Sequence, residues 1–148
     1  MRWRDLATVA EIQRLSFRPG LAYGWFSLVA VKLTPGVGFL VARTPDLKVV
    51  GCIIGDTHRG DARVMNIAVH PAARRQGVGA LLLEAIAETM PDGDMVLMAE
   101  EPNLGAQALY EREGFERRGR TANYYGRGRH GVWMRKRRTS GPDKHIRV

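Results

Sequence analysis

Two glycines and two arginines stand directly before an apolar helix pattern, in the stretch HPAARRQGVGALLLEAI that begins at His70. The first residues of a helix have unpaired backbone amides and a partial positive charge, so a helix start binds phosphate well. Gly77 and Gly79 have no Cβ, which lets a phosphate approach these amides, and Arg74 and Arg75 add positive charge. The pattern therefore predicts a phosphate-binding loop. Neither the P-loop motif nor the three-glycine dinucleotide fingerprint is present, so a different class of phosphorylated ligand is expected.

A second group of residues that could take part in binding or catalysis follows in the stretch NLGAQALYEREGF, residues 103–115. On a helix, Asn103, Ala106 and Tyr110 lie on one face. Asn103 is a favourable N-cap, and Gly114 is a typical C-terminal stop. The small Ala106 leaves room for a ligand along this face, with Tyr110 at its far end. The same pattern also fits an ordinary capped helix with a buried tyrosine, so both interpretations stay open at this point.

The elements that must position these residues follow from the spacing of apolar residues and from the turn residues between them. The expected order is two helices, three strands, a helix, a strand, a helix and two strands. This order predicts an α/β (α+β) domain in which helices flank a mixed sheet. The expected segments are 5–17, 21–33, 37–44, 48–56, 62–69, 77–90, 94–100, 103–113, 114–120 and 131–137.

Length and charge place limits on the organisation of the chain. With 148 residues, it is expected to form one domain over residues 1–138, followed by a basic C-terminal tail over residues 139–148. The net charge is +8, and residues 117–148 contain 11 basic residues and one acidic residue. Such a segment attracts a nucleic acid, a ribosomal surface or an acidic substrate, or else it is a solvated edge strand and tail.

Cysteine content and hydropathy exclude several classes of protein. Cys52 is the single cysteine and stands in an apolar strand pattern, so we expect it to be packed and to take no part in a disulfide or a metal site. No apolar run approaches the roughly 20 residues that a membrane helix needs. The amphipathic N-terminal pattern, which includes acidic residues, fits neither a signal peptide nor a transit peptide. A soluble cytoplasmic protein without metal or membrane partner is therefore expected.

The two motifs together resemble one known superfamily. Arg74-x-x-Gly77-x-Gly79, between a strand and a helix, resembles the acyl-CoA pyrophosphate loop of the GNAT N-acetyltransferases. The run from Asn103 through Tyr110 to Gly114 and Phe115 is similar to the second cofactor motif of the same superfamily. The resemblance covers residues 48–137. It implies a mostly antiparallel sheet, acetyl-CoA as cofactor with coenzyme A as product, and transfer of an acetyl group to a primary amine.

The resemblance also implies a role for each residue of the two motifs. The amine attacks the thioester directly, without an acyl-enzyme intermediate, and Tyr110 protonates the departing thiolate. Asn103 binds the cofactor. Backbone amides of Ile67, Ala68 and Val69 fix the pantetheine arm and polarise the thioester carbonyl. The pyrophosphate is held by a continuous loop: Arg74, Arg75, Gln76, Gly77, Val78, Gly79 and Ala80.

A third segment narrows the choice of acceptor. Tyr124 and Tyr125, in the sequence NYY before the last strand, resemble the loop with which RimI-like ribosomal-protein alanine acetyltransferases cover the substrate's N-terminus. This resemblance implies a protein or peptide N-terminus as acceptor, with ribosomal proteins as one candidate. Two alternatives stay open. One is a GNAT enzyme that acetylates a small amine such as a polyamine or amino sugar, and the other is a basic nucleic-acid-binding module with aromatic residues among its arginines.

The general base is where the chain departs from the RimI-like pattern. Those enzymes carry a glutamate five residues before the cofactor-motif asparagine, and here that position is Met98, which cannot accept a proton. Side chains alternate along a strand, so Glu100 is the next residue on the same face and Glu101 is expected to point away. Glu100 is therefore the candidate base, acting through a water. The alternative is that no side-chain base exists and Glu100 only attracts the ammonium group.

Overall fold

The computed structural model describes residues 1–90 and 93–138. Its elements follow the predicted order of two helices, three strands, a helix, a strand, a helix and two strands. Two short 3-10 helices, η1 and η2, precede α1 and α3. The elements are η1 (Trp3–Asp5), α1 (Leu6–Ser16), α2 (Trp25–Leu33), β1 (Gly38–Arg43), β2 (Val49–His58), β3 (Asp61–Val69), η2 (Pro71–Ala73), α3 (Val78–Thr89), β4 (Met95–Glu100), α4 (Leu104–Arg112), β5 (Glu116–Thr121) and β6 (Gly131–Lys136).

Local sequence accounts for the ends of the helices. The first helix buries Leu6, Val9 and Ile12, as their spacing predicts, whereas Leu15 is 41% exposed. The second helix begins at Trp25, later than the apolar pattern indicates, with Gly24 as its N-cap. Helix α4 is capped by Asn103, and Gly114 follows it with a φ of +91°, a value that favours glycine.

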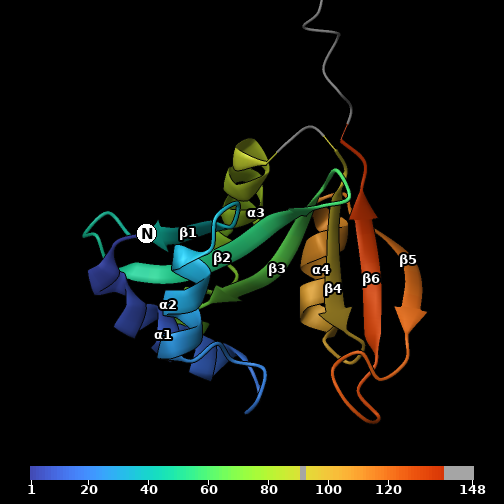
Figure 1. The fold of residues 1–148 in the computed structure, drawn as a ribbon, viewed down its shortest axis with the longest axis horizontal. Helices are drawn as coiled ribbons and strands as arrows, with labels where there is room; N and C mark the ends of the chain where they lie inside the picture. The colour runs from blue at the N-terminus through green and yellow to red at the C-terminus, as the bar shows by residue number, and fades with distance from the viewer. Residues whose placement is uncertain (91–92, 139–148) are drawn as a thin grey trace, which may run out of the picture.

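The six strands form one sheet with helices on both faces (Figure 1). The strand order is β1-β2-β3-β4-β6-β5, and every neighbouring pair is antiparallel except the parallel pair β3–β4. Alternate residues of β2 show the two layers: Ile53 packs in the core beneath α3 and α4, whereas Cys52 and Ile54 pack against α1 and α2. The sheet is therefore mixed and mostly antiparallel.

The two halves of the sheet separate between β3 and β4. Their pairing extends only from Ala62 with Met95 to Val64 with Leu97. A bulge follows at once, because Ile54 of β2 pairs with Asn66 while Gly55 pairs with Val64, which leaves Met65 without a partner on β2. Beyond the bulge the carboxyl ends of β3 and β4 diverge (Figure 1). One edge of β3 is consequently free of strand pairing.

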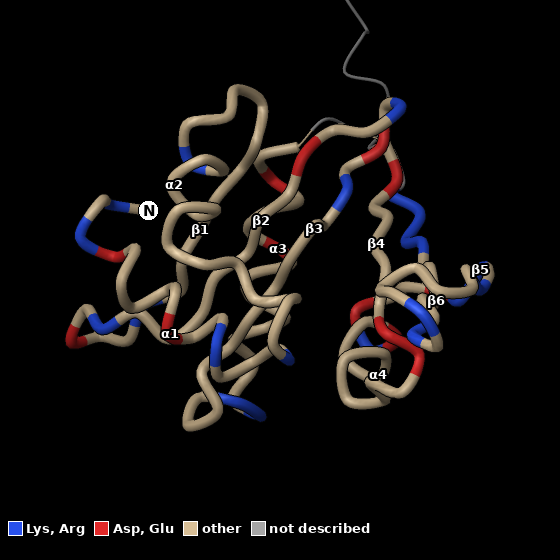
Figure 2. The backbone as a smooth tube through the Cα atoms, turned by 60° about the horizontal axis from the view of Figure 1, so that its bottom comes forward, with Lys and Arg blue, Asp and Glu red and all other residues tan. Residues whose placement is uncertain are grey.

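Basic residues lie along β5 and β6, as the charge distribution of the sequence predicts (Figure 2). Several are neutralised locally: Arg118 pairs with Glu116, and Arg135 pairs with both Asp61 and Asp94. The predicted tail, residues 139–148, lies outside the described residues. Within the described ranges no helix has the length and hydropathy needed to cross a membrane.

Candidate active site

The start of α3 has the features of an anion site. Gly77 is the N-cap, with a φ of +79°, and it has no side chain with which to cap the first turn. The backbone amides of Val78, Gly79 and Ala80 therefore stand at the helix start without intrahelical acceptors. Arg75 lies exposed beside them, also in the left-handed region with a φ of 62°. The predicted loop thus has the backbone conformation and the charge that a pyrophosphate requires.

The two glycines of the loop serve different purposes. A Cβ on Gly77 would meet no atom within 4 Å, so this position needs glycine for its backbone conformation and for open access. A Cβ on Gly79 would lie 2.8 Å from Cδ2 of Leu109, so this position needs glycine because α3 and α4 approach closely. The sequence pattern predicts a close phosphate at both positions. The structure gives Gly79 an additional packing role.

The free edge of β3 presents backbone amides next to this loop. The amide of His70 donates to the carbonyl of Val50 on β2 (2.8 Å). Because N–H groups alternate between the two edges of a strand, the amide of Ala68 also faces β2, whereas those of Ile67 and Val69 face the gap between β3 and β4. Two of the three predicted backbone donors therefore lie where an extended ligand could bind as a substitute strand.

Helix α4 places Asn103 and Tyr110 as its sequence predicts, on one face of the helix. The Asn103 Oδ1 accepts from the amide of Ala106 (3.1 Å), so this oxygen acts as the N-cap. Tyr110 is buried, and its ring lies 5.9 Å from that of Phe115. Among the described residues, the Tyr110 hydroxyl has no hydrogen-bond partner. Burial raises the pKa of Tyr110, and the neighbouring Tyr125 raises it further, so the hydroxyl keeps its proton.

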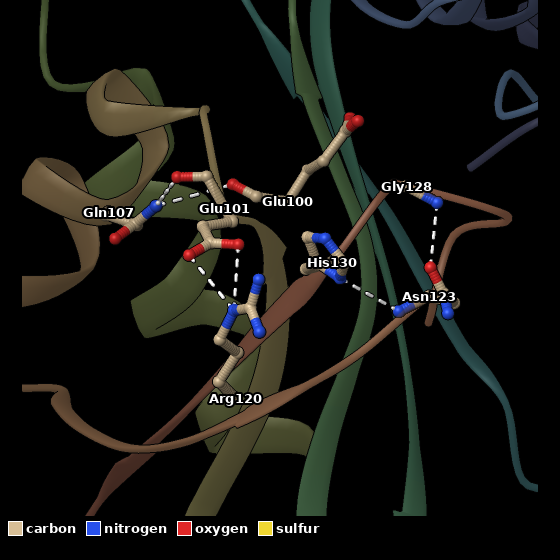
Figure 3. A network of polar contacts seen from close by, with 7 residues as sticks. All are labelled: Glu100, Glu101, Gln107, Arg120, Asn123, Gly128 and His130. Carbon is tan, nitrogen blue, oxygen red and sulfur yellow. Dashed lines mark hydrogen bonds and ion pairs between the residues drawn. The ribbon is translucent and has the colours of Figure 1, made fainter.

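Glu100, the candidate base, is the last residue of β4, and Glu101 follows it. Burial alternates along the strand, which places Met98 and Glu100 on the same side. The carboxylate of Glu100 is 15% exposed and lies 3.0 Å from Nε of Arg129. The carboxylate of Glu101 points the other way and pairs with Arg120 at 3.0 Å (Figure 3). The expected orientation of both glutamates is therefore confirmed.

The loop between β5 and β6 carries Tyr124 and Tyr125, whose rings make an edge-to-face contact at 4.9 Å. The Tyr125 hydroxyl donates to the carbonyl of Met98 (3.0 Å), which fixes the loop over the end of β4. Burial raises the pKa of Tyr125, with smaller contributions from Tyr124 and Glu100. The backbone of this loop is closed by Asn123, whose Oδ1 accepts from the amide of Gly128 at 2.7 Å (Figure 3). Tyr125 thus links the predicted acceptor loop to the strand of the candidate base.

The structure adds polar residues that the sequence patterns do not single out. Gln107 is buried and donates to the carbonyls of Glu100 (3.3 Å) and Glu101 (2.8 Å), which ties α4 to the end of β4 (Figure 3). Gln13 of α1 and Asn66 of β3 exchange two hydrogen bonds of 2.6 and 3.1 Å beside the bulge. The sequence offers one signal for this pair: Gln13 is a polar residue on the apolar face of a helix.

Cys52 is packed, as expected from its apolar strand. It is fully buried, and burial raises the pKa of its thiol to about 11. A thiol that stays protonated and inaccessible is a poor nucleophile. Across residues 1–90 and 93–138, no group of three or more histidine, cysteine or acidic side chains is arranged to hold a metal ion.

Comparison with known proteins agrees with this geometry. Residues 35–117 match the family described as the acetyltransferase (GNAT) domain. The chain belongs to the GNAT family. It is therefore an acetyl-CoA-dependent N-acetyltransferase, as its two motifs predict. A mycothiol acetyltransferase of Parafrankia is 34% identical to this chain over 109 residues. The aligned residues make up 74% of this chain but only 30% of that longer protein.

Solved structures show the same fold. The ribosomal-protein-S18-alanine N-acetyltransferase of Escherichia coli has a TM-score of 0.78 at 21% identity, with coverage of 97% of this chain and 94% of that chain. An aminoglycoside 6'-N-acetyltransferase complexed with coenzyme A has a TM-score of 0.77 at 16% identity, with 96% and 95% coverage. At these identities the likeness establishes the GNAT fold alone.

Proposed function

We propose that this GNAT enzyme acetylates the α-amine of a protein N-terminus. The observation that supports this acceptor best is the tyrosine loop: Tyr125 holds the β5–β6 loop onto β4 at Met98, directly beside Glu100. This arrangement covers the position where an amine must approach the thioester. Among proteins with this fold, the Escherichia coli ribosomal-protein-S18-alanine acetyltransferase is named for such an acceptor.

Charge around the proposed acceptor site argues against polycationic small amines. Both nearby carboxylates are neutralised by arginines, Glu100 by Arg129 and Asp56 by Arg63. The Asp56 carboxylate raises the pKa of Arg63, and Arg63 pairs with Val96 of β4, two residues before Met98. A polyamine or aminoglycoside would meet two guanidinium groups there without an unpaired carboxylate, whereas a single α-amine at the end of an extended peptide avoids this repulsion.

In the proposed reaction, the cofactor supplies an activated acetyl thioester. The amides at the start of α3, together with Arg75, bind its pyrophosphate, and the Ile67 and Val69 amides orient its arm and the thioester carbonyl. Tyr110 donates its proton to the departing thiolate. Glu100 accepts the proton of the amine through a water. Asn103 contributes to the cofactor site at the start of α4, and Tyr124 and Tyr125 enclose the acceptor.

A peptide panel tests the proposed acceptor. Peptides varied at their first three residues, N-terminally blocked peptides containing lysine, spermidine and an aminoglycoside are each incubated with acetyl-CoA, and the products are located by mass spectrometry. An α-amine has a pKa near 8 and lysine near 10.4, so the neutral fraction at pH 7.5 differs by roughly two orders of magnitude. We expect acetylation of free N-termini, with little on lysine. Acetylation of spermidine or the aminoglycoside alone would overturn the proposal.

Replacing Glu100 with glutamine is expected to lower kcat about tenfold. The effect is modest for a general base because part of an α-amine is already neutral near pH 7.5. Glu101→Gln is the matched control, since Glu101 is the adjacent residue and also pairs with an arginine, yet points away from the site. An unchanged kcat with a raised KM for Glu100→Gln would make Glu100 a binding residue only.

A further inference from the structure

The end of β3 is held by a closed set of three hydrogen bonds. The Nε of Arg74 donates to the carbonyl of Val69 (3.1 Å), and its Nη2 donates to Oγ of Ser16 (3.3 Å). The Ser16 hydroxyl in turn donates to the same Val69 carbonyl (3.4 Å). Arg74 therefore joins the loop before α3, the end of β3 and the last residue of α1.

These contacts fix one peptide plane from both sides. The Val69 carbonyl and the His70 amide belong to the same plane and point to opposite edges of the strand. The His70 amide donates to Val50 of β2 (2.8 Å), and the Val69 carbonyl accepts from Arg74 and Ser16. Because this peptide plane is held on both sides, the backbone of Val69 has little freedom to rotate. The Val69 amide is therefore kept pointing into the gap between β3 and β4.

The adjacent arginine is placed differently. Arg74 and Arg75 are both exposed, but among residues 1–90 and 93–138 the Arg75 guanidinium has no hydrogen-bond or ion-pair partner. The loop therefore contains two neighbouring arginines with different surroundings. Arg74 donates to acceptors within the protein, and the guanidinium of Arg75 is available to an anion at the start of α3.

We infer that Arg74 is a positioning residue for acetyl transfer and that Arg75 is the arginine whose guanidinium binds the pyrophosphate. The inference rests on the proposed function and corrects the role that the motif assigns to Arg74. Arg74 holds the Val69 backbone, and through it the donors that face the thioester. Because misplacement of a reacting group by about 1 Å can cost on the order of 10²-fold in rate, such a residue affects turnover more than cofactor affinity.

Arg74→Gln and Arg75→Gln form a matched pair, since each removes one positive charge from the same loop. The dissociation constant of coenzyme A is measured by calorimetry at several salt concentrations, and kcat is measured with saturating acetyl-CoA and the best peptide of the panel. For Arg75→Gln we expect weaker binding, a flatter salt dependence and a smaller loss of kcat than for Arg74→Gln. For Arg74→Gln we expect a smaller change in salt dependence than for Arg75→Gln and a kcat at least about tenfold lower.

Two further measurements separate positioning from loss of charge. Hydrogen exchange of the ligand-free protein should be faster at residues 66–70 in Arg74→Gln and unchanged in Arg75→Gln. The loss of activity in the double variant Ser16→Ala/Arg74→Gln should differ from the sum of the losses in the two single variants, because both side chains act on one carbonyl. Weaker coenzyme A binding with a flattened salt dependence and an unchanged kcat for Arg74→Gln would overturn the inference. If the wild type fails to bind coenzyme A, the proposed function itself is refuted.

Discussion

Replacing Gly77 with glutamate is expected to weaken coenzyme A binding by about 100-fold or more while the domain stays folded. A Cβ at this N-cap meets no atom within 4 Å, so the cost to folding is the left-handed backbone, about 1–2 kcal/mol. The carboxylate would stand at the amides that the pyrophosphate needs. Like charges in contact cost several kcal/mol, and each 1.4 kcal/mol is tenfold in affinity. Calorimetric titration with coenzyme A measures the loss.

The chain offers a matched control for this substitution. Gly60, in the turn between β2 and β3, has a φ of +85° and also has open space around its Cβ position. Gly60→Glu therefore introduces the same strain and the same charge far from the start of α3, and it should bind coenzyme A like the wild type. Gly79→Glu is unsuitable, since its side chain would clash with Leu109 and disturb the contact of α3 with α4. Full affinity in Gly77→Glu would contradict a phosphate site at this helix start.

The sequence predicts the order of the elements because that order depends on local patterns. The spacing of Leu6, Val9 and Ile12, the caps at Gly77 and Asn103, and the stop at Gly114 each act within one or two turns of chain. The late start of α2 at Trp25 shows the limit of such patterns. An apolar run marks burial, and it marks a helix boundary only where a cap or a breaker stands at its end.

The geometry of the site could not be predicted in the same way, because it depends on pairings between distant segments. The gap beside β3 requires the bulge at Met65 and the short register with β4. The partner of Glu100 is Arg129, which is 29 residues later in the chain and reaches it only because the β5–β6 loop folds over β4. Motif matching likewise treats Arg74 and Arg75 alike, and only their contacts distinguish them.

Replacing Tyr110 with phenylalanine is expected to lower kcat by roughly 10²-fold or more, the range typical of a general acid. The substitution removes only the hydroxyl, and the ring keeps its contact with Phe115. Since the hydroxyl has no hydrogen-bond partner among the described residues, its loss leaves no partner unsatisfied there, and thermal stability should change little. Single-turnover kinetics with acetyl-CoA and the best peptide acceptor isolate the chemical step.

The pH dependence gives this prediction a second measurement with a defined sign. A general acid must be protonated, so activity falls as pH rises through its pKa. Burial raises the pKa of Tyr110, and this fall is therefore expected at higher pH than for an ordinary tyrosine and should be absent in Tyr110→Phe. Near-full turnover in Tyr110→Phe, with chemistry shown to limit the rate, would assign the proton to another donor. Tyr125 is then the alternative donor, because its hydroxyl stands at the Met98 carbonyl of β4 and its charge raises the pKa of Tyr110.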